Sequence, residues 1–344
     1  MGTKLDELMK KVNKDVKEEA FTVGMPIYEY EKVPFTSPKM NFVTYGGLPL
    51  GRLVEFFGEE GGGKTTTALD QIANFQNMYP DREVLYVDAE NTLDIEWARK
   101  IGVDVDRIRL YQPKTESAEY IFQVIKEATE SGELGMWILD SVPCLIADKD
   151  LGKDLTDDAR VGGISGKLTE FCRKIVGPCA KQSCMGIFIN QLRDKINSTI
   201  PGQTNTPGGR ALKHFCTVRM EFRKGTYIDE DGKTLSRSSG EPNSQKIMVN
   251  MVKTKFCRPN RHVGQYTINF DTGIDYITDL IDQAIYYEII DKRGAWFNIV
   301  DTNTGEVIKD KIQGQNNLHK LLDDDTELLQ KVEELVDDKF KEEA

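Results

Sequence analysis

Residues 58–65 read Gly58-Glu59-Glu60-Gly61-Gly62-Gly63-Lys64-Thr65, and Thr66 follows them. This stretch fits G-x-x-x-x-G-K-[ST], the pattern of a phosphate-binding loop. The apolar run 52–57 precedes it, and residues 66–73, of helix-forming composition, follow it. Because the pattern requires a strand before the loop and a helix after it, these surroundings favour a nucleotide site over a glycine-rich turn that ends in lysine by chance.

The residue types of this loop suit a polyphosphate. Glycines let the backbone wrap around the phosphates, and the N–H groups at the start of the following helix point toward their oxygens. We expect Lys64 to supply a mobile cation and the hydroxyl of Thr65 to bind Mg²⁺.

Three later apolar runs each end in polar side chains. Residues 83–87 lead to Glu90, residues 136–139 to Asp140, and residues 186–189 to Gln191. Because ligands of open α/β sheets collect at the carboxyl ends of the strands, we expect these groups beside the phosphates. Asp140 fits a carboxylate that holds Mg²⁺ through water, Glu90 a group that activates the attacking water, and Gln191 a sensor of the γ-phosphate. Turn formation would explain one such residue, but three together favour a site.

A longer series of segments carries a family resemblance. It comprises GGLPLGRLVE at 46–55, GKTT at 63–66, VDAE at 87–90, LDIEWARKIG at 93–102, DSV at 140–142, FINQ at 188–191, GGRALK at 208–213 and GAW at 294–296. In order and spacing, from about residue 35 to about residue 320, the series resembles the bacterial RecA recombinases. A generic phosphate-loop protein would share only the loop.

The resemblance implies an α/β fold: a RecA-like P-loop ATPase core with a mainly parallel twisted sheet, an N-terminal helix and a small C-terminal α+β domain. We expect an N-terminal oligomerisation helix and arm at 1–34, the core at 35–273, the small domain at 274–336 and an acidic tail at 337–344. Apolar residues recur at helical spacing over residues 4–18. By resemblance, this helix packs on the neighbouring subunit of a filament; docking onto its own core is the alternative.

The resemblance also implies a nucleotide site shared by two protomers. Lys253 and Lys255, two apart on one strand, project from the same face and would reach ATP in the adjacent subunit; read in isolation, they form a solvated face. Adenine would stack on Trp97, which replaces the family's usual tyrosine, and Asp94 could accept from its amine. The expected cofactors are ATP and Mg²⁺, and the expected nucleotide contacts are Gly58, Glu59, Glu60, Gly61, Gly62, Gly63, Lys64, Thr65, Thr66, Asp94, Trp97 and Asp140.

Two polar stretches, near 148–163 and 193–207, correspond by position to the family's DNA-binding loops. The expected DNA contacts are Arg160, Val161, Gly162, Arg173, Arg193, Lys195, Ile196, Ile200, Gly208 and Gly209. In the second loop the basic groups suit phosphates, and the isoleucines could wedge between bases. Around the first loop acids outnumber bases, and Gly166 stands where the family has an arginine that contacts DNA. At His214 the family usually has a phenylalanine that passes the nucleotide signal across the subunit interface, so the resemblance implies an altered coupling here. The alternative is that His214 is only a half-buried interface residue.

Charge and composition limit which partners, metals and cellular locations are compatible with the chain. The net charge of −11 argues at first against nucleic acid, but residues 323–344 carry ten acids and three lysines, so residues 1–322 carry only −4. Residues 193–223 have a net charge of +4, which suits phosphate contact; a solvated charged loop is the alternative, and composition alone favours it. The six cysteines form no C-x-x-C pair, which argues against zinc. No apolar run approaches the ~20 residues of a membrane helix, and there is no apolar signal region, so we expect a cytoplasmic protein.

The chain is therefore expected to be a single-stranded-DNA-dependent ATPase and homologous recombinase. It would form a filament on single-stranded DNA, pair it with double-stranded DNA and exchange strands in recombination and repair, with single-strand-binding and loader proteins as further partners. A hexameric helicase-like motor is one alternative, but it should lack the N-terminal packing helix and the GAW domain. A non-catalytic DNA-binding mediator is the other, and it would turn over no ATP. The departures from the bacterial pattern would suit a bacteriophage-encoded member.

Overall fold

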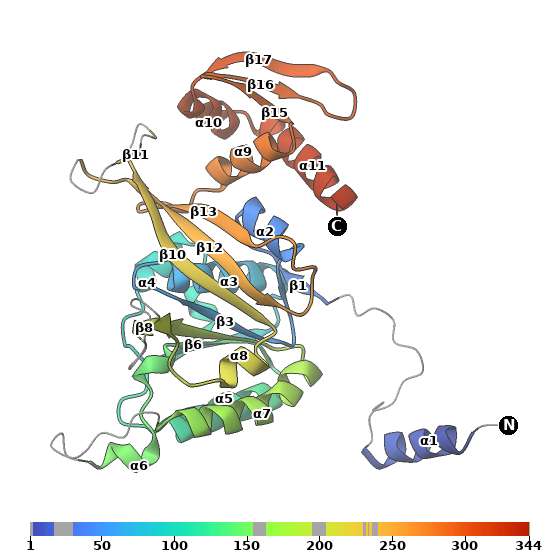
Figure 1. Cartoon of the computed structure of the whole chain (residues 1–344), viewed down its shortest axis with the longest axis vertical. Coiled ribbons are helices and arrows are strands. Elements are labelled where there is room, and N and C mark those ends of the chain that lie inside the picture. The colour runs from blue at the N-terminus through green and yellow to red at the C-terminus, as the bar shows by residue number, and fades with distance from the viewer. Residues whose placement is uncertain are drawn as a thin grey trace. The chain divides into compact units, whose positions relative to one another are not determined.

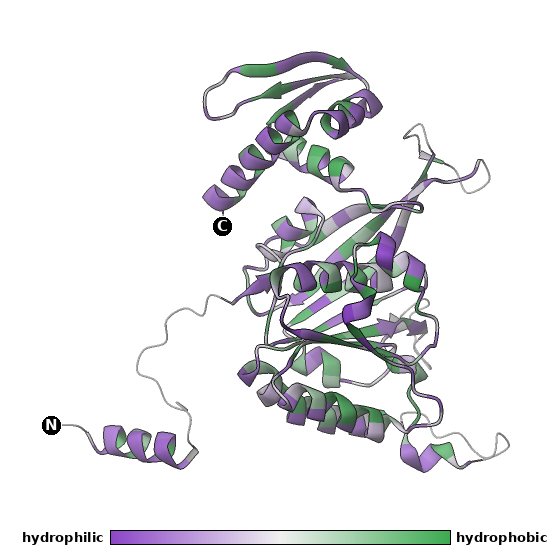
Figure 2. Ribbon diagram, turned by 180° about the vertical axis from the view of Figure 1, so that it is seen from behind, coloured by the Kyte–Doolittle hydropathy of each residue, from purple (hydrophilic) through white to green (hydrophobic). Residues whose placement is uncertain are grey.

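The computed structural model describes residues 3–16, 30–153, 163–194, 204–229, 232, 234–235 and 240–343. It divides into two units, residues 1–31 and residues 32–344 (Figure 1). The first unit contains α1 (Lys4–Val16), a mainly hydrophilic helix with interspersed apolar residues (Figure 2). Its Leu5 and Leu8 side chains are 60% and 51% exposed. The amphipathic helix predicted from the sequence is therefore present.

A large sheet forms the centre of the second unit. Within the described ranges its strands run in the order β14-β13-β12-β10-β3-β7-β6-β4-β5, and β11 pairs with β10. Neighbours from β10 to β5 are parallel, whereas β11, β12, β13 and β14 extend the sheet antiparallel. The strands are β3 (Leu53–Gly58), β4 (Glu83–Asp88), β5 (Ile108–Tyr111), β6 (Leu134–Asp140), β7 (Met185–Gln191), β10 (Val218–Ile228), β11 (Thr234–Leu235), β12 (Ser244–Thr254), β13 (Val263–Asn269) and β14 (Gly273–Ile274). The predicted mainly parallel α/β sheet is confirmed.

Helices cover both faces of this sheet because its strands are apolar on both sides. Along β6, Met136 and Ile138 belong to the core that includes α3, whereas Trp137 and Leu139 belong to the core that includes α5 and α7. The helices of the second unit ahead of the small domain are α2 (Pro38–Thr44), α3 (Lys64–Met78), α4 (Ile95–Lys100), α5 (Ala118–Glu130), α6 (Asp148–Leu151), α7 (Ser165–Lys181) and α8 (Ala211–Phe215), with 3₁₀ turns at Val105–Arg107 and Val142–Cys144. Two short strand pairs, β1 (Lys32–Val33) with β2 (Leu48–Pro49) and β8 (Arg193–Asp194) with β9 (Thr204–Asn205), complete this part.

The C-terminal part is a small α+β region. The strands β15 (Ile290–Arg293), β16 (Trp296–Val300) and β17 (Val307–Gln313) form an antiparallel sheet beside α9 (Tyr276–Tyr286), α10 (Gln315–Asp324) and α11 (Thr326–Glu343). Among the described residues, none of the helices combines the length and apolar content needed to cross a bilayer.

The expected acidic tail is not a separate element, because α11 continues through residue 337 to Glu343. Ion pairs accommodate its acids on the helix: Lys339 lies 2.8 Å from Glu342, and Arg261 of the core lies 3.0 Å from Glu343. The acidic residues predicted as a tail from 337 therefore lie on the last part of α11.

Packing across the sheet predicts a sharp effect at Gly186 on β7. A Cβ atom added there would lie 2.1 Å from Cζ2 of Trp137, whose side chain is fully buried between Phe171 and Phe188. Gly186→Ala should therefore lower the free energy of unfolding by about 2–3 kcal/mol, measured by urea denaturation. Gly166→Ala is the control, because that helical glycine is exposed with no neighbour within 4 Å, and alanine there should add up to about 1 kcal/mol. Equal losses in both variants would refute the packing explanation.

Candidate nucleotide and DNA site

The phosphate-binding pattern forms a tight loop between β3, which ends at Gly58, and α3, which begins at Lys64. Gly63 caps α3 with φ 84°, and a Cβ there would lie 2.7 Å from the hydroxyl of Tyr266. Only glycine therefore fits this position. Lys64 is 7% exposed, and its Nζ donates to the carbonyls of Glu59 (2.6 Å) and Gly58 (3.2 Å). Burial lowers its pKa, while the charges of Asp140 and Glu90 oppose that shift.

The hydroxyl of a buried tyrosine contacts the end of the phosphate-binding loop. The hydroxyls of Tyr266 on β13 and Thr67 on α3 hydrogen-bond to each other at 2.6 Å. The carbonyl of Gly63 lies 3.2 Å from the first and 2.9 Å from the second, and it accepts from whichever hydroxyl does not donate to the other. Sequence reasoning missed Tyr266, because it lies about 200 residues from the loop and its strand carries no motif.

Asp140 is the last residue of β6, and its carboxylate lies beside the first turn of α3. Its Oδ2 accepts from the hydroxyl of Thr65 (2.9 Å) and from that of the buried Tyr86 on β4 (2.8 Å). Burial raises the pKa of Asp140 to about 6, with these two hydrogen bonds opposing the shift and the charge of Glu90 adding to it. The structure thus brings together the two residues predicted to hold Mg²⁺. Tyr86 was missed because it lies within an apolar strand.

Glu90 and Gln191 meet beside this pair. Gln191 Nε2, at the end of β7, donates to Glu90 Oε1 at 3.1 Å, and the same oxygen accepts from the hydroxyl of Ser141. The ends of β4, β6 and β7 are neighbours in the sheet. Three strand ends therefore deliver a carboxylate, a hydroxyl and an amide to one place, as expected for parallel strands.

The residues expected around adenine lie at the start of α4. Asp94 caps this helix, since its Oδ1 accepts from the backbone N–H of Trp97 at 3.0 Å. The indole Nε1 of Trp97 donates to the hydroxyl of Thr66 at 3.2 Å. The half-buried indole is therefore tied to the first turn of α3, next to the phosphate loop.

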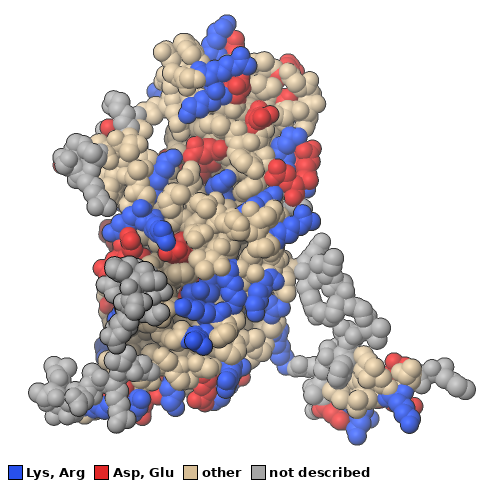
Figure 3. All heavy atoms as spheres, in the orientation of Figure 1, with Lys and Arg blue, Asp and Glu red and all other residues tan. Residues whose placement is uncertain are grey.

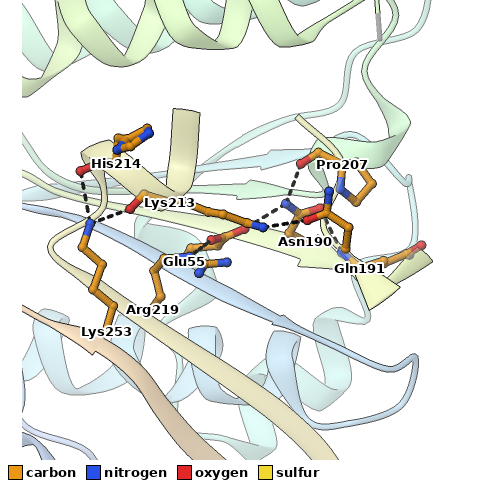
Figure 4. Close-up of polar contacts among 9 residues, drawn as sticks. Glu55, Asn190, Gln191, Pro207, Lys213, His214, Arg219 and Lys253 are labelled. Atoms are coloured by element: carbon orange, nitrogen blue, oxygen red, sulfur yellow. Dashed lines mark hydrogen bonds and ion pairs between the residues drawn. The ribbon is translucent and has the colours of Figure 1, made fainter. Parts of the chain in front are cut away.

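Lys253, on β12, contacts the last turn of α8. Its Nζ donates to the carbonyls of Lys213 (2.7 Å) and His214 (3.1 Å) at the end of α8 (Figure 4). Burial lowers the pKa of Lys253, and the nearby charge of Lys255 lowers it further. His214 thus contributes a backbone carbonyl to the lysine that was predicted to act across the subunit interface.

The family models for the RecA N-terminal domain and the RecA C-terminal domain match residues 4–275 and 278–341. Protein RecA of Clostridioides difficile is 34% identical over 291 residues, which cover 85% of this chain and 78% of that protein. Protein RecA of Mesoplasma florum is 34% identical over 288 residues, covering 84% and 80%, and that of Acholeplasma laidlawii is 32% identical over 296 residues, covering 86% and 83%.

The chain belongs to the RecA family. Membership makes it an ATP-binding and DNA-binding recombinase of the RecA type, and it does not favour the helicase-like motor or the non-catalytic mediator. The second RecA domain match, residues 278–341, covers the GAW segment and nearly all of the small C-terminal region.

The DNA residues expected of this RecA-family chain are placed in part. Arg173 is exposed on α7, and Arg193 is exposed on β8. Gly208 and Gly209, with φ 88° and 72°, lead into α8. Six of the expected contacts lie outside the described residues: Arg160, Val161, Gly162, Lys195, Ile196 and Ile200. Figure 3 shows Lys and Arg gathered on the face where Figure 1 places α8 and the lower ends of β10 and β12.

The raised pKa of Asp140 predicts how stability changes with pH. Its ordinary value is 3.8 and its value in the fold is about 6. Between these values the unfolded chain loses a proton that the folded, nucleotide-free chain retains, so stability falls as pH rises through the window, by up to about 3 kcal/mol. Asp140→Asn removes the buried charge and should be more stable than wild type by about 1–3 kcal/mol at pH 8, with no difference near pH 4, in urea denaturation.

Asp70→Asn is the matched control. Burial also raises the pKa of Asp70 to about 6, but its carboxylate accepts from the backbone N–H of Thr36 and from Asn74 Nδ2 and not from Thr65. Both variants should show the same pH dependence of stability, and only Asp140→Asn should weaken Mg²⁺-dependent nucleotide binding. An Asp140→Asn protein less stable than wild type at pH 8 would refute the desolvation argument.

Proposed function

We propose that this chain is a single-stranded-DNA-dependent ATPase that assembles into a helical filament on single-stranded DNA, pairs it with homologous duplex and exchanges strands. The observation that carries the proposal is the convergence of Lys64, Thr65, Glu90, Asp140 and Gln191 at one edge of the sheet, in a chain that matches both RecA domains. Base pairing would supply sequence recognition, and ATP hydrolysis would release DNA.

The donor set at the phosphate loop fits Mg²⁺. Thr65 Oγ1 and Asp140 Oδ2 are hard oxygen donors 2.9 Å apart, and Mg²⁺ in nucleotide sites uses one or two such protein oxygens, with waters and phosphates as its other ligands. We infer that Thr65 would bind the cation directly and Asp140 through water. When bound, the cation neutralises charge that develops on the phosphates. Lys64 would exchange its bonds to the carbonyls of Gly58 and Glu59 for bonds to phosphate oxygens.

Glu90 and Gln191 would act on the γ-phosphate side. Glu90 is the proposed base for the attacking water, held by the hydroxyl of Ser141. In the nucleotide-free chain the amide of Gln191 is bonded to Glu90. A γ-phosphate would compete for this amide, so that nucleotide binding moves Gln191 and frees Glu90 toward water.

The remaining roles depend on a second protomer or on DNA. Lys253 and Lys255 would complete the ATP site of the adjacent subunit, and the exposed apolar residues of α1 would pack on that subunit. Trp97 would stack on adenine, and Asp94 would accept from its exocyclic amine. The DNA contacts are the residues named above, and single-strand-binding and loader proteins are proposed as further partners.

The proposed base is tested by Glu90→Gln. The amide can hold water without taking a proton, so this variant should bind ATP and single-stranded DNA normally while hydrolysis falls by about 10²-fold or more. DNA-stimulated phosphate release gives the measurement. Glu96→Gln, an exposed carboxylate on nearby α4, should retain the wild-type rate. Undiminished hydrolysis by Glu90→Gln would assign the base to another residue.

The shared site is tested by mixing two inactive proteins. The double variant Lys253→Ala/Lys255→Ala should bind nucleotide as an isolated subunit but show no DNA-stimulated hydrolysis. It retains Glu90, whereas the Glu90→Gln variant retains both lysines, so a junction between them rebuilds one intact site. Partial ATPase activity should return when the two are mixed on single-stranded DNA.

The control for this mixture carries all three changes, Glu90→Gln with both lysine substitutions, and is mixed with the Glu90→Gln protein. No junction in that mixture has an intact base, so no activity should return. If the first mixture is shown to co-assemble and also stays inactive, the lysines act within their own subunit.

A further inference from the structure

One buried amide contacts both the proposed γ-phosphate sensor and the end of the second DNA loop. Asn190, the residue before Gln191 on β7, is fully buried. Its Oδ1 accepts from the backbone N–H of Gln191 at 3.0 Å. Its Nδ2 donates to Glu55 Oε1 on β3 at 3.0 Å and to the carbonyl of Pro207 at 3.1 Å (Figure 4). Within the described residues, all the hydrogen-bonding atoms of this side chain are thus engaged.

The position of Asn190 is fixed by a buried ion pair. Glu55 is fully buried, Arg219 is 7% exposed, and Arg219 Nε donates to Glu55 Oε2. The two residues are register partners on the parallel strands β3 and β10. The guanidinium of Arg219 also lies 4.5 Å from the ring centre of Phe57. Because Glu55 cannot turn away without leaving a charge unpaired in the core, it anchors the Nδ2 end of the Asn190 amide.

The partner of Asn190 on the DNA side is also held. Pro207 follows the short pair β8–β9, in which Arg193 lies opposite Asn205. Lys213 Nζ on α8 donates to Asn205 Oδ1 at 2.7 Å, and Lys253 binds the carbonyls at the end of α8. The segment from Thr204 to Phe215 is therefore a restrained piece of backbone, and Asn190 joins it directly to the end of β7.

We propose that Asn190 is a positioning residue that couples Gln191 to the backbone around Pro207, and thus nucleotide state to DNA binding. The proposal rests on the function proposed above. When Gln191 moves toward a γ-phosphate, its backbone N–H pulls on Asn190 Oδ1, and the amide turns about its bond to Glu55. The carbonyl of Pro207 then follows or loses its hydrogen bond to Nδ2. By reciprocity, DNA that fixes the Pro207 segment tightens ATP binding by the same factor.

The test compares two affinities. The dissociation constant for fluorescein-labelled oligo(dT) is measured with and without the imido analogue of ATP and Mg²⁺, and the ratio gives the coupling factor. Asn190→Leu keeps the volume of the side chain and removes its three hydrogen bonds. The coupling factor should fall about ten-fold or more, toward one, while the nucleotide-free affinity for oligo(dT) and the DNA-free affinity for nucleotide each change by less than about three-fold.

Gln76→Met is the matched control, since it removes another buried amide that clamps a loop. Gln76 is 4% exposed, its Nε2 donates to the carbonyl of Asp104 at 2.9 Å, and its Oε1 accepts from the N–H of Asp104 at 3.0 Å. It should destabilise the fold in thermal unfolding and leave the coupling factor at the wild-type value. If Asn190→Leu does not fold, the same measurement is made on Asn190→Ser, whose hydroxyl ends one bond short of the amide nitrogen.

The outcomes separate the two proposals. A wild-type coupling factor in a folded Asn190 variant overturns the role of Asn190, as does an equal loss of coupling in Gln76→Met. A wild-type protein whose oligo(dT) affinity does not respond to the ATP analogue overturns the proposed function, and the role of Asn190 with it. Loss of coupling in the Asn190 variant alone supports the inference.

Discussion

The parallel pairing of four strands is the constraint on which the proposed site depends. Register places Gly58 at the end of β3 opposite Gln191 at the end of β7, and Asp88 at the end of β4 opposite Asp140 at the end of β6. Because all these strands end at one edge, the loop after β3 and the polar groups after the other strands must meet. The bonds of Asp140 to Thr65 and of Gln191 to Glu90 follow from that edge. A shift in the register of β7 would break the second contact and displace the segment that leads to β8.

The same sheet holds buried carboxylates in two kinds of surroundings. Glu55 is paired with Arg219 in the interior, whereas the carboxylate of Asp140 accepts from the hydroxyls of Thr65 and Tyr86, and burial raises its pKa to about 6. The first arrangement fixes backbone positions, and the second leaves a carboxylate that a divalent cation would stabilise. Stability and function therefore oppose each other at Asp140, which is the behaviour expected of a functional site.

The sequence predicted features whose signal is local. The phosphate loop, the three strand ends and the amphipathic α1 each lie within a short window with a clear pattern, and the structure contains them. The contacts of Tyr86 and Tyr266 with the site were not predicted. A tyrosine within an apolar strand is interpreted as a core residue unless the partner of its hydroxyl is known. Glu55 did carry a signal, a charge within the apolar run 52–57, but only the fold shows that Arg219 is its partner. The sequence did not indicate that the acidic residues from 337 onward would lie on a helix. In the structure α11 continues to Glu343, and Lys339 pairs with Glu342 there.

The central claim is that ATP bound at the phosphate loop drives homologous strand exchange. The most direct test incubates the protein with circular single-stranded DNA, homologous linear duplex, Mg²⁺ and ATP, and follows the conversion of the duplex into nicked circles on a gel. We expect conversion by the wild-type protein that requires ATP and homology, and none by Lys64→Ala, in which the phosphate charge has lost its cation. Exchange by Lys64→Ala at the wild-type rate, or no exchange by a wild-type protein that binds both ATP and DNA, would contradict the account.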